Sequence, residues 1–223
     1  RLVAELWCEE ERMTTPGLAY APPSGGADAL ASYAEYLKDL LGSNVGCISG
    51  EASATTLTEE TGPAWELMIV GTPGDAGSKS LFSCSRDGIA SSGWSASVLL
   101  ARRPSWPLRG ILLLIQGEAR DEKATDWTLR LAEPSGASVT ALAVVPPASA
   151  TYHRLARVGG GMAEFLAADT PLGGEMRQVA HRLVERGIEG TLRLRQGSPA
   201  WETRRELMRG RFDLLVIGGA PGG

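Results

Sequence analysis

Short apolar segments alternate with amphipathic segments along most of the chain. The apolar segments have the length of strands and occupy residues 2–7, 45–48, 65–70, 95–100, 111–115, 139–145, 192–195 and 212–217. Segments with helical spacing lie between them, at residues 28–41, 52–61, 79–91, 121–132, 175–186 and 199–209. Regular alternation of strands and helices predicts an α/β fold, with a parallel sheet covered by helices on both faces.

The pattern occurs twice. Gly50 and Gly71 are 21 residues apart, as are Gly197 and Gly218, and each pair encloses a helix and a strand. Residues 65–71 also match residues 212–218 in residue type, position by position. We interpret the chain as a tandem duplication with domains at residues 1–107 and 108–223. The first domain lacks its opening strand and helix, and the second lacks its closing helix and strand.

Composition excludes several classes of protein. The chain has 223 residues, 43% of them apolar and 22% charged, which is typical of a folded domain. Its three cysteines and two histidines show no disulfide or metal-binding spacing, so no metal is expected. A net charge of −4 without a basic cluster argues against nucleic acid. The longest aliphatic run, Ile111–Ile115, is too short to span a membrane, and a cytoplasmic location is expected.

Three segments in this order resemble the universal stress protein domain: Ile111–Gly117, Val139–Pro147 and Phe212–Gly218. The resemblance implies two tandem open Rossmann-like domains, each a five-stranded parallel sheet with strand order 3-2-1-4-5. Many members of this family bind ATP or AMP at the carboxyl ends of the strands. The binders carry the motif G-x2-G-x9-G-[ST] after the fourth strand, where glycines turn backbone N–H groups toward phosphate.

The resemblance assigns candidate site residues one by one. In the first copy, Gly71 and Gly74 match the start of the motif and Ser85 its hydroxyl position, but Cys84 replaces the third glycine. In the second copy, Gly218 begins the loop and Pro221 stands where the next glycine would be. Gln116 stands where binders have an Asp, and Val144 where the backbone contacts adenine. The expected nucleotide-binding residues are Val70, Gly71, Gly74, Ser85, Gln116, Val144 and Gly218, and the cofactor is ATP or AMP, with or without Mg²⁺, or none.

Two functions remain open for this sequence. The first is an adenine-nucleotide-binding module for stress response or signalling, in a homodimer or with its two domains paired through the strand at residues 95–100. The second is a degenerate, non-binding interaction module, for example the cytosolic tail of a membrane transporter, although this segment itself would not contact the membrane. No catalytic constellation is found, so no enzyme is expected, with weak ATP hydrolysis left open.

Other signals favour structural roles. Residues 24–29 resemble the pyrophosphatase loop of ATP-dependent enzymes but lack its final Ser and follow a Pro-containing loop at residues 18–23. Gly71–Gly74 fits a ligand loop and a plain tight turn equally well. We expect His181 at the surface. Four arginines between residues 204 and 211 alternate with Glu202 and Glu206, which predicts a solvated helix face with ion pairs along it.

Overall fold

The computed structural model describes residues 2–6, 18–20, 27–42, 47–49, 67–71, 97–101, 106–145 and 162–218. The chain divides into two compact units, one of residues 1–106 with 219–223 and the other of residues 107–218.

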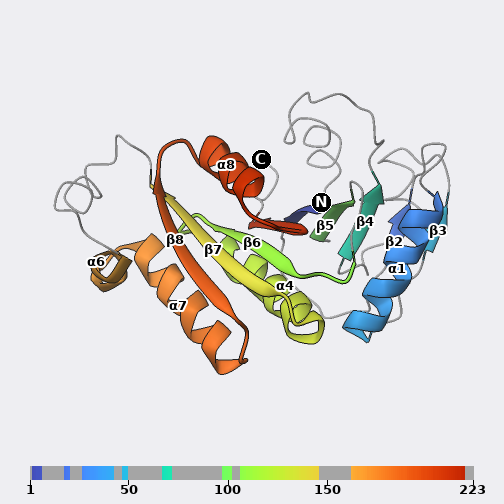
Figure 1. The fold of residues 1–223 in the computed structure, drawn as a ribbon, viewed down its shortest axis with the longest axis horizontal. Helices are drawn as coiled ribbons and strands as arrows, with labels where there is room; N and C mark the ends of the chain where they lie inside the picture. The colour runs from blue at the N-terminus through green and yellow to red at the C-terminus, as the bar shows by residue number, and fades with distance from the viewer. Residues whose placement is uncertain are drawn as a thin grey trace. The chain divides into compact units, whose positions relative to one another are not determined.

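The second unit is built on four parallel strands. These are β6 (Gly110–Ile115), β7 (Ser138–Val145), β8 (Gly190–Gln196) and β9 (Leu214–Gly218). They lie side by side in the order β9-β6-β7-β8 (Figure 1). Numbered along the chain and counted from β8, this is the order 3-2-1-4. The expected open parallel sheet is therefore confirmed for four strands, and its centre, β6 and β7, is almost entirely buried.

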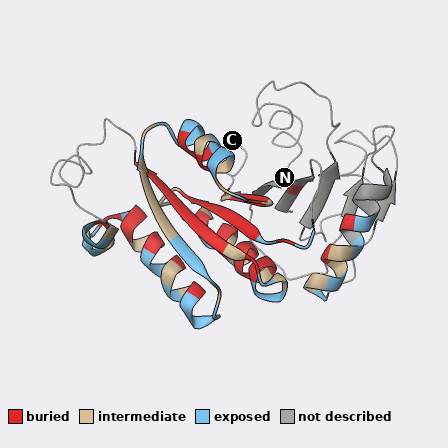
Figure 2. Ribbon diagram, viewed as in Figure 1, coloured by how far each residue is buried: buried red, intermediate tan, exposed pale blue. Residues whose placement is uncertain are grey.

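Helices cover both faces of this sheet, as expected for right-handed crossovers. Helices α4 (Arg120–Ser135) and α7 (Pro171–Glu185) cover one face, and α8 (Pro199–Arg209) covers the other (Figure 1). A short helix, α6 (Met162–Ala167), precedes α7. Ala124, Trp127 and Leu131, which share helical spacing in the sequence, are all buried. The burial pattern of α4 and α7 thus follows their apolar stripes (Figure 2).

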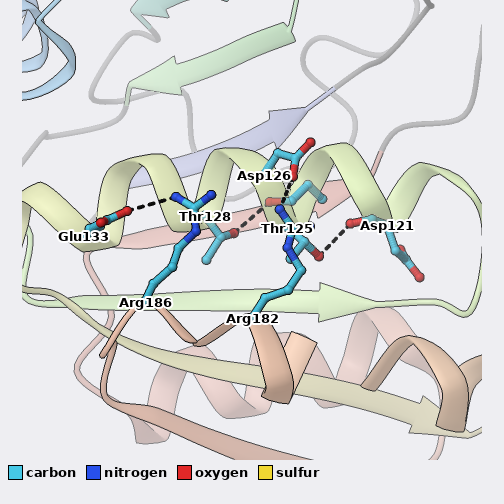
Figure 3. A network of polar contacts seen from close by, with 8 residues as sticks. Asp121, Thr125, Asp126, Thr128, Glu133, Arg182 and Arg186 are labelled. Atoms are coloured by element: carbon cyan, nitrogen blue, oxygen red, sulfur yellow. Dashed lines mark hydrogen bonds and ion pairs between the residues drawn. The ribbon is translucent and has the colours of Figure 1, made fainter. Parts of the chain in front are cut away.

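Ion pairs join the two helices on the first face. Arg186, which directly follows α7, lies 2.9 Å from the carboxylate of Glu133 on α4 (Figure 3). Arg182 pairs with Asp126, one turn earlier on α7 and about two turns earlier on α4. Within α4, the buried Thr125 hydroxyl donates to the carbonyl of Asp121 at 2.7 Å. Because the charged groups are partly exposed, these pairs set helix alignment more than they add stability.

The acidic side of α8 is buried, so the predicted solvated face is wrong for Glu202 and Glu206. Only 5% of Glu202 and 2% of Glu206 is exposed. The carboxylate of Glu206 pairs with Arg193 and Arg195, which alternate along β8 beneath the helix. The expected i, i+3 pair from Arg205 to Glu202 is present at 3.5 Å. Helical spacing did not reveal that arginines of strand β8 pair with Glu206.

The described strands of the first unit form two groups. Strand β4 (Leu67–Gly71) is parallel to β5 (Ser97–Ala101), and β1 (Leu2–Leu6) is antiparallel to β5. Strand β2 (Leu18–Tyr20) is parallel to β3 (Cys47–Ser49). The sequence predicted neither the antiparallel direction of β1 nor β2, which replaces part of an expected loop. Strand β2 has only three residues, Leu18–Tyr20, between prolines at positions 16 and 22, which is too short for a strand periodicity to be recognised.

Helix α1 (Ala27–Leu41) confirms the expected helix of the first unit. Its Tyr33 and Leu37 side chains are buried, at the helical spacing read from the sequence. The ring centroids of Tyr33 and Trp106 lie 6.0 Å apart, so the two aromatic rings are in contact. The expected helices at residues 52–61 and 79–91 lie outside the described residues.

Removing the arginines around Glu206 is expected to destabilise the protein more than removing the glutamate charge. The double variant Arg193→Ala/Arg195→Ala leaves a buried carboxylate without a counter-ion and should lower the free energy of unfolding by about 3 kcal/mol. Glu206→Gln leaves two half-exposed arginines that water can solvate, so it should cost clearly less. Urea unfolding measures both, with Arg186→Ala, below about 1 kcal/mol, as the surface control. Equal losses in the two variants would contradict the assignment.

Candidate functional site

The carboxyl ends of β6 and β9 meet in the second unit. Their register pairs Leu114 with Ile217, which brings the ends of both strands to the same edge of the sheet. There the Gln116 side-chain amide donates to the carbonyl of Gly218 at 3.1 Å. From β6 the chain crosses to β7 on one side, while β9 lies on the other. Open α/β sheets bind ligands at such a change of direction, outside the carboxyl ends of the strands.

The loop between β6 and α4 closes around a carboxylate of its own chain. One oxygen of Asp121, Oδ2, accepts hydrogen bonds from the backbone N–H groups of Gln116 at 2.8 Å, Gly117 at 2.6 Å and Glu118 at 3.1 Å. Successive N–H groups that converge in this way form a binding site for an anion. Asp121 already fills it from inside the protein, and its side chain is fully buried.

Burial dominates the electrostatics of this carboxylate. It raises the pKa of Asp121, because the charged form loses water, while the three backbone hydrogen bonds partly oppose the rise. The other oxygen, Oδ1, has no hydrogen-bond partner among the described residues. A carboxyl group in this position therefore costs stability when ionised and is retained for the loop geometry that it imposes.

Further carboxylates surround the loop. Burial, and then the charges of Asp121 and Glu122, raise the pKa of Glu175 on α7. Glu118 pairs with Arg120 at the start of α4. The start of α4 therefore combines a favourable helix dipole with an excess of negative side chains, and a phosphate group placed over it would be repelled.

Two glycines let four parts of the chain approach one another at this edge. Gly117 has φ +78°, and a Cβ there would lie 2.9 Å from the backbone nitrogen of Leu172 in the first turn of α7. A Cβ on Gly218 would lie 2.8 Å from the carbonyl oxygen of Arg120. Only glycine fits both contacts without a shift of backbone. The end of β9, the β6–α4 loop and the first turns of α4 and α7 are thus packed together.

The structure brings three of the predicted site residues to one sheet edge. Gln116 and Gly218 are hydrogen-bonded, and Val144 lies on β7, one residue beyond the Ala143 that pairs with Ile115 of β6. The remaining predicted residues belong to the first unit. Val70 and Gly71 end strand β4, whereas Gly74 and Ser85 lie outside the described residues.

Sequence reasoning missed the role of Asp121. It placed Asp121 at the start of a helix but gave it no function. The available signal was an acidic side chain in the first helical turn, four residues after a glycine that follows a buried strand. Such a side chain can reach back to the loop N–H groups, as capping residues do.

Other candidate chemistry is not supported in the described part of the chain. His181 is exposed, as expected, and lies 3.3 Å from the carboxylate of Glu185. Among the described residues, no group of His, Cys, Asp and Glu is placed to hold a metal ion. In the same part of the chain, no helix is both long and apolar enough to cross a membrane.

No family model matches the sequence, and no curated protein matches it. Several solved structures, however, are similar to this chain. A protein from Pseudomonas aeruginosa UCBPP-PA14, provisionally assigned to the universal stress proteins, is 14% identical over 98% of this chain and 82% of its own, with a TM-score of 0.54. A functionally unknown protein from Pseudomonas aeruginosa PAO1 gives the same values. A universal stress protein from Burkholderia pseudomallei is 21% identical over 52% of this chain and 85% of its own, with a TM-score of 0.37.

The expected resemblance is thereby confirmed at the level of the fold. This chain has the fold of the universal stress proteins, an open α/β sheet whose four described strands in the second unit follow the order 3-2-1-4. The tandem arrangement and the ligand stay predictions.

Gly117→Ala is expected to cost more stability than Gly136→Ala. Both glycines have positive φ, +78° and +67°, so alanine is strained at either position by about 1–2 kcal/mol. Only at position 117 does the new Cβ also meet backbone, so the free energy of unfolding should fall by about 3 kcal/mol. Urea unfolding of the two variants tests this difference. Equal losses would show that the β6–α4 loop does not pack against α7 as described.

The Asp121 carboxyl should give stability a defined pH dependence. Its pKa is raised in the folded state, so its contribution is most favourable below the ordinary value of 3.8 and is lost as pH rises through the folded pKa. The unfolding free energy of the wild type, minus that of Asp121→Asn, should therefore fall as the pH rises above the ordinary pKa of 3.8. Chemical unfolding at several pH values measures the difference. A difference that grows with pH would mean that the N–H bonds outweigh burial.

Proposed function

We propose that this chain is an adenine-nucleotide-binding module for stress response or signalling, with a site at the carboxyl edge of β6 and β9. The observation that carries the proposal is the hydrogen bond between the Gln116 amide and the Gly218 carbonyl at the change of strand direction. It places a side chain with both donor and acceptor capacity where this kind of fold binds ligands. The shared fold with universal stress proteins supports the same location.

The local charges favour recognition of the nucleoside over its phosphates. The loop N–H groups that could hold a phosphate are already bonded to Asp121, and Glu122 and Glu175 lie nearby. The carboxylates do not oppose binding of ribose or adenine in the same way, because these groups are uncharged. The Gln116 amide and the backbone at Val144 are the groups that we expect to hydrogen-bond to them. In the second unit we therefore expect AMP to bind better than ATP, unless Mg²⁺ offsets the phosphate charge.

The proposal extends to the first unit through its phosphate loop. Val70 and Gly71 end β4, and Gly74 and Ser85 continue the motif that the resemblance assigns to phosphate binding. In this proposal the domains are residues 1–107 and 108–223, each a copy of the same fold. Alignment of the Pseudomonas structure over 98% of the chain supports a relationship that includes both parts. The module has no catalytic centre of its own, acts in the cytoplasm, and forms a homodimer or pairs its two domains.

One observation favours a second function, a non-binding interaction module such as the cytosolic tail of a membrane transporter. All three converging N–H groups of the β6–α4 loop donate hydrogen bonds to the carboxylate of Asp121. In a protein that has lost its ligand, such an internal acceptor keeps the loop N–H groups hydrogen-bonded. The two functions differ in whether any adenine nucleotide binds.

Calorimetric titration with AMP and ATP distinguishes them. Gln116→Ala removes the amide at the edge of the sheet and should weaken AMP binding about tenfold, the equivalent of one good hydrogen bond. Gln178→Ala removes a glutamine from the exposed face of α7 and should leave binding unchanged.

Three other outcomes each lead to a definite conclusion. No heat with about 1 mM of either nucleotide would contradict nucleotide binding and favour the interaction module. Binding that survives Gln116→Ala but is lost in Gly74→Val would move the site to the first unit. Tighter binding of metal-free ATP than of AMP would contradict the charge argument for the second unit.

A further inference from the structure

Helix α8 presents an unusual outer face. Trp201, Arg204, Arg205 and Met208 follow the spacing i, i+3, i+4, i+7 and therefore share one side of the helix. Trp201 is 58% exposed and Met208 69% exposed. The Arg205 guanidinium lies over the Trp201 ring, 5.1 Å from its centroid. We call these four residues the α8 outer face.

The opposite side of the same helix buries acidic and polar groups. Glu202, Thr203 and Glu206 are all buried toward the sheet. An ordinary surface helix does the reverse, with apolar side chains inward and charges in water. Here the glutamates are satisfied by arginines of β8 and by Arg205, while large apolar side chains stay in water. The stability of the unit alone gives no reason to expose Trp201 and Met208.

Charge and residue type on the α8 outer face are those of a recognition surface. It carries two arginines and no acidic side chain, because the helix's glutamates are turned inward. Two more exposed arginines, Arg209 and Arg211, extend the positive charge past the end of the helix. Trp, Arg and Met are the residue types enriched at the centres of protein interfaces, where an aromatic ring is flanked by arginine.

We propose that the α8 outer face docks an acidic amphipathic helix of a protein partner. Apolar residues of that helix would cover Trp201 and Met208, and its carboxylates would pair with Arg204 and Arg205. The i, i+3, i+4, i+7 spacing forms a ridge of the kind that packs against another helix. Charge complementarity selects an acidic partner over a basic one.

The same features disfavour a membrane or nucleic acid as the occupant. Insertion into a lipid surface needs a broad apolar face, whereas α8 offers one Trp and one Met between arginines. The ion pairs of the buried Glu206 with Arg193 and Arg195 of β8 also hold the helix against the sheet. The chain as a whole carries a charge of −4, which opposes general attraction to nucleic acid. The docking surface lies on the sheet face opposite α4 and α7, so it does not depend on the proposed nucleotide site.

The test uses a labelled synthetic helical peptide of about 18 residues, with Leu at helical spacing and Glu at the flanking positions. Fluorescence anisotropy with the intact chain should give saturable binding that weakens at least tenfold in Trp201→Ala. It should weaken similarly in Arg204→Glu and as salt rises from about 0.05 M to about 0.3 M. Val184→Ala, which removes a 79% exposed apolar side chain from α7, is the matched control and should bind like the wild type.

Several results would overturn the proposal. They are no saturable binding of the Leu/Glu peptide up to about 1 mM, equal binding of a peptide with Lys in place of Glu, and binding unchanged by Trp201→Ala. Binding to phosphatidylserine vesicles that is lost in Trp201→Ala, without binding of the peptide, would assign the face to a membrane. Self-association that is lost in Trp201→Ala, without binding of the peptide, would assign it to a second copy of this chain.

Discussion

The carboxylate of Asp121 fixes the edge of the sheet on which the second unit's candidate site depends. By accepting three backbone N–H groups, it closes the β6–α4 loop over the first turn of α4. The closed loop requires positive φ at Gly117 and leaves no space for a side chain against α7. It also directs the Gln116 amide across to the carbonyl of Gly218. One buried charge thus positions the ends of two strands and the starts of two helices.

This arrangement has a direct consequence for ligand recognition. A helix start after a glycine loop would ordinarily attract phosphate, but here an internal anion occupies the converging N–H groups and other carboxylates lie close by. What remains for a ligand is the uncharged amide of Gln116 and the backbone at the strand ends. A second buried acidic group, Glu206, orders the opposite face, where its pairing with β8 turns the glutamates of α8 inward and leaves Trp201 and Met208 in water.

Local patterns predicted the framework of the fold but not these two buried charges. The apolar runs around Ile111, Val139 and Leu214 gave the strands β6, β7 and β9, and helical spacing gave the buried stripe of α4. Gln116, Val144 and Gly218 could be placed together because carboxyl ends of parallel strands share one edge. Asp121 and Glu206 were missed because their partners, loop N–H groups and arginines on a neighbouring strand, become neighbours only in the folded chain. Strand β2 was missed because three residues carry too little periodicity.

Amide hydrogen exchange of the β6–α4 loop tests the central claim most directly. The N–H groups of Gln116, Gly117 and Glu118 should be strongly protected without any ligand, since each donates to Asp121. In Asp121→Ala all three should exchange much faster, while the N–H of Ala137, which donates to Ala132 at the other end of α4, keeps its protection. Fast exchange of the three amides in the wild type, or protection unchanged in Asp121→Ala, would contradict the account.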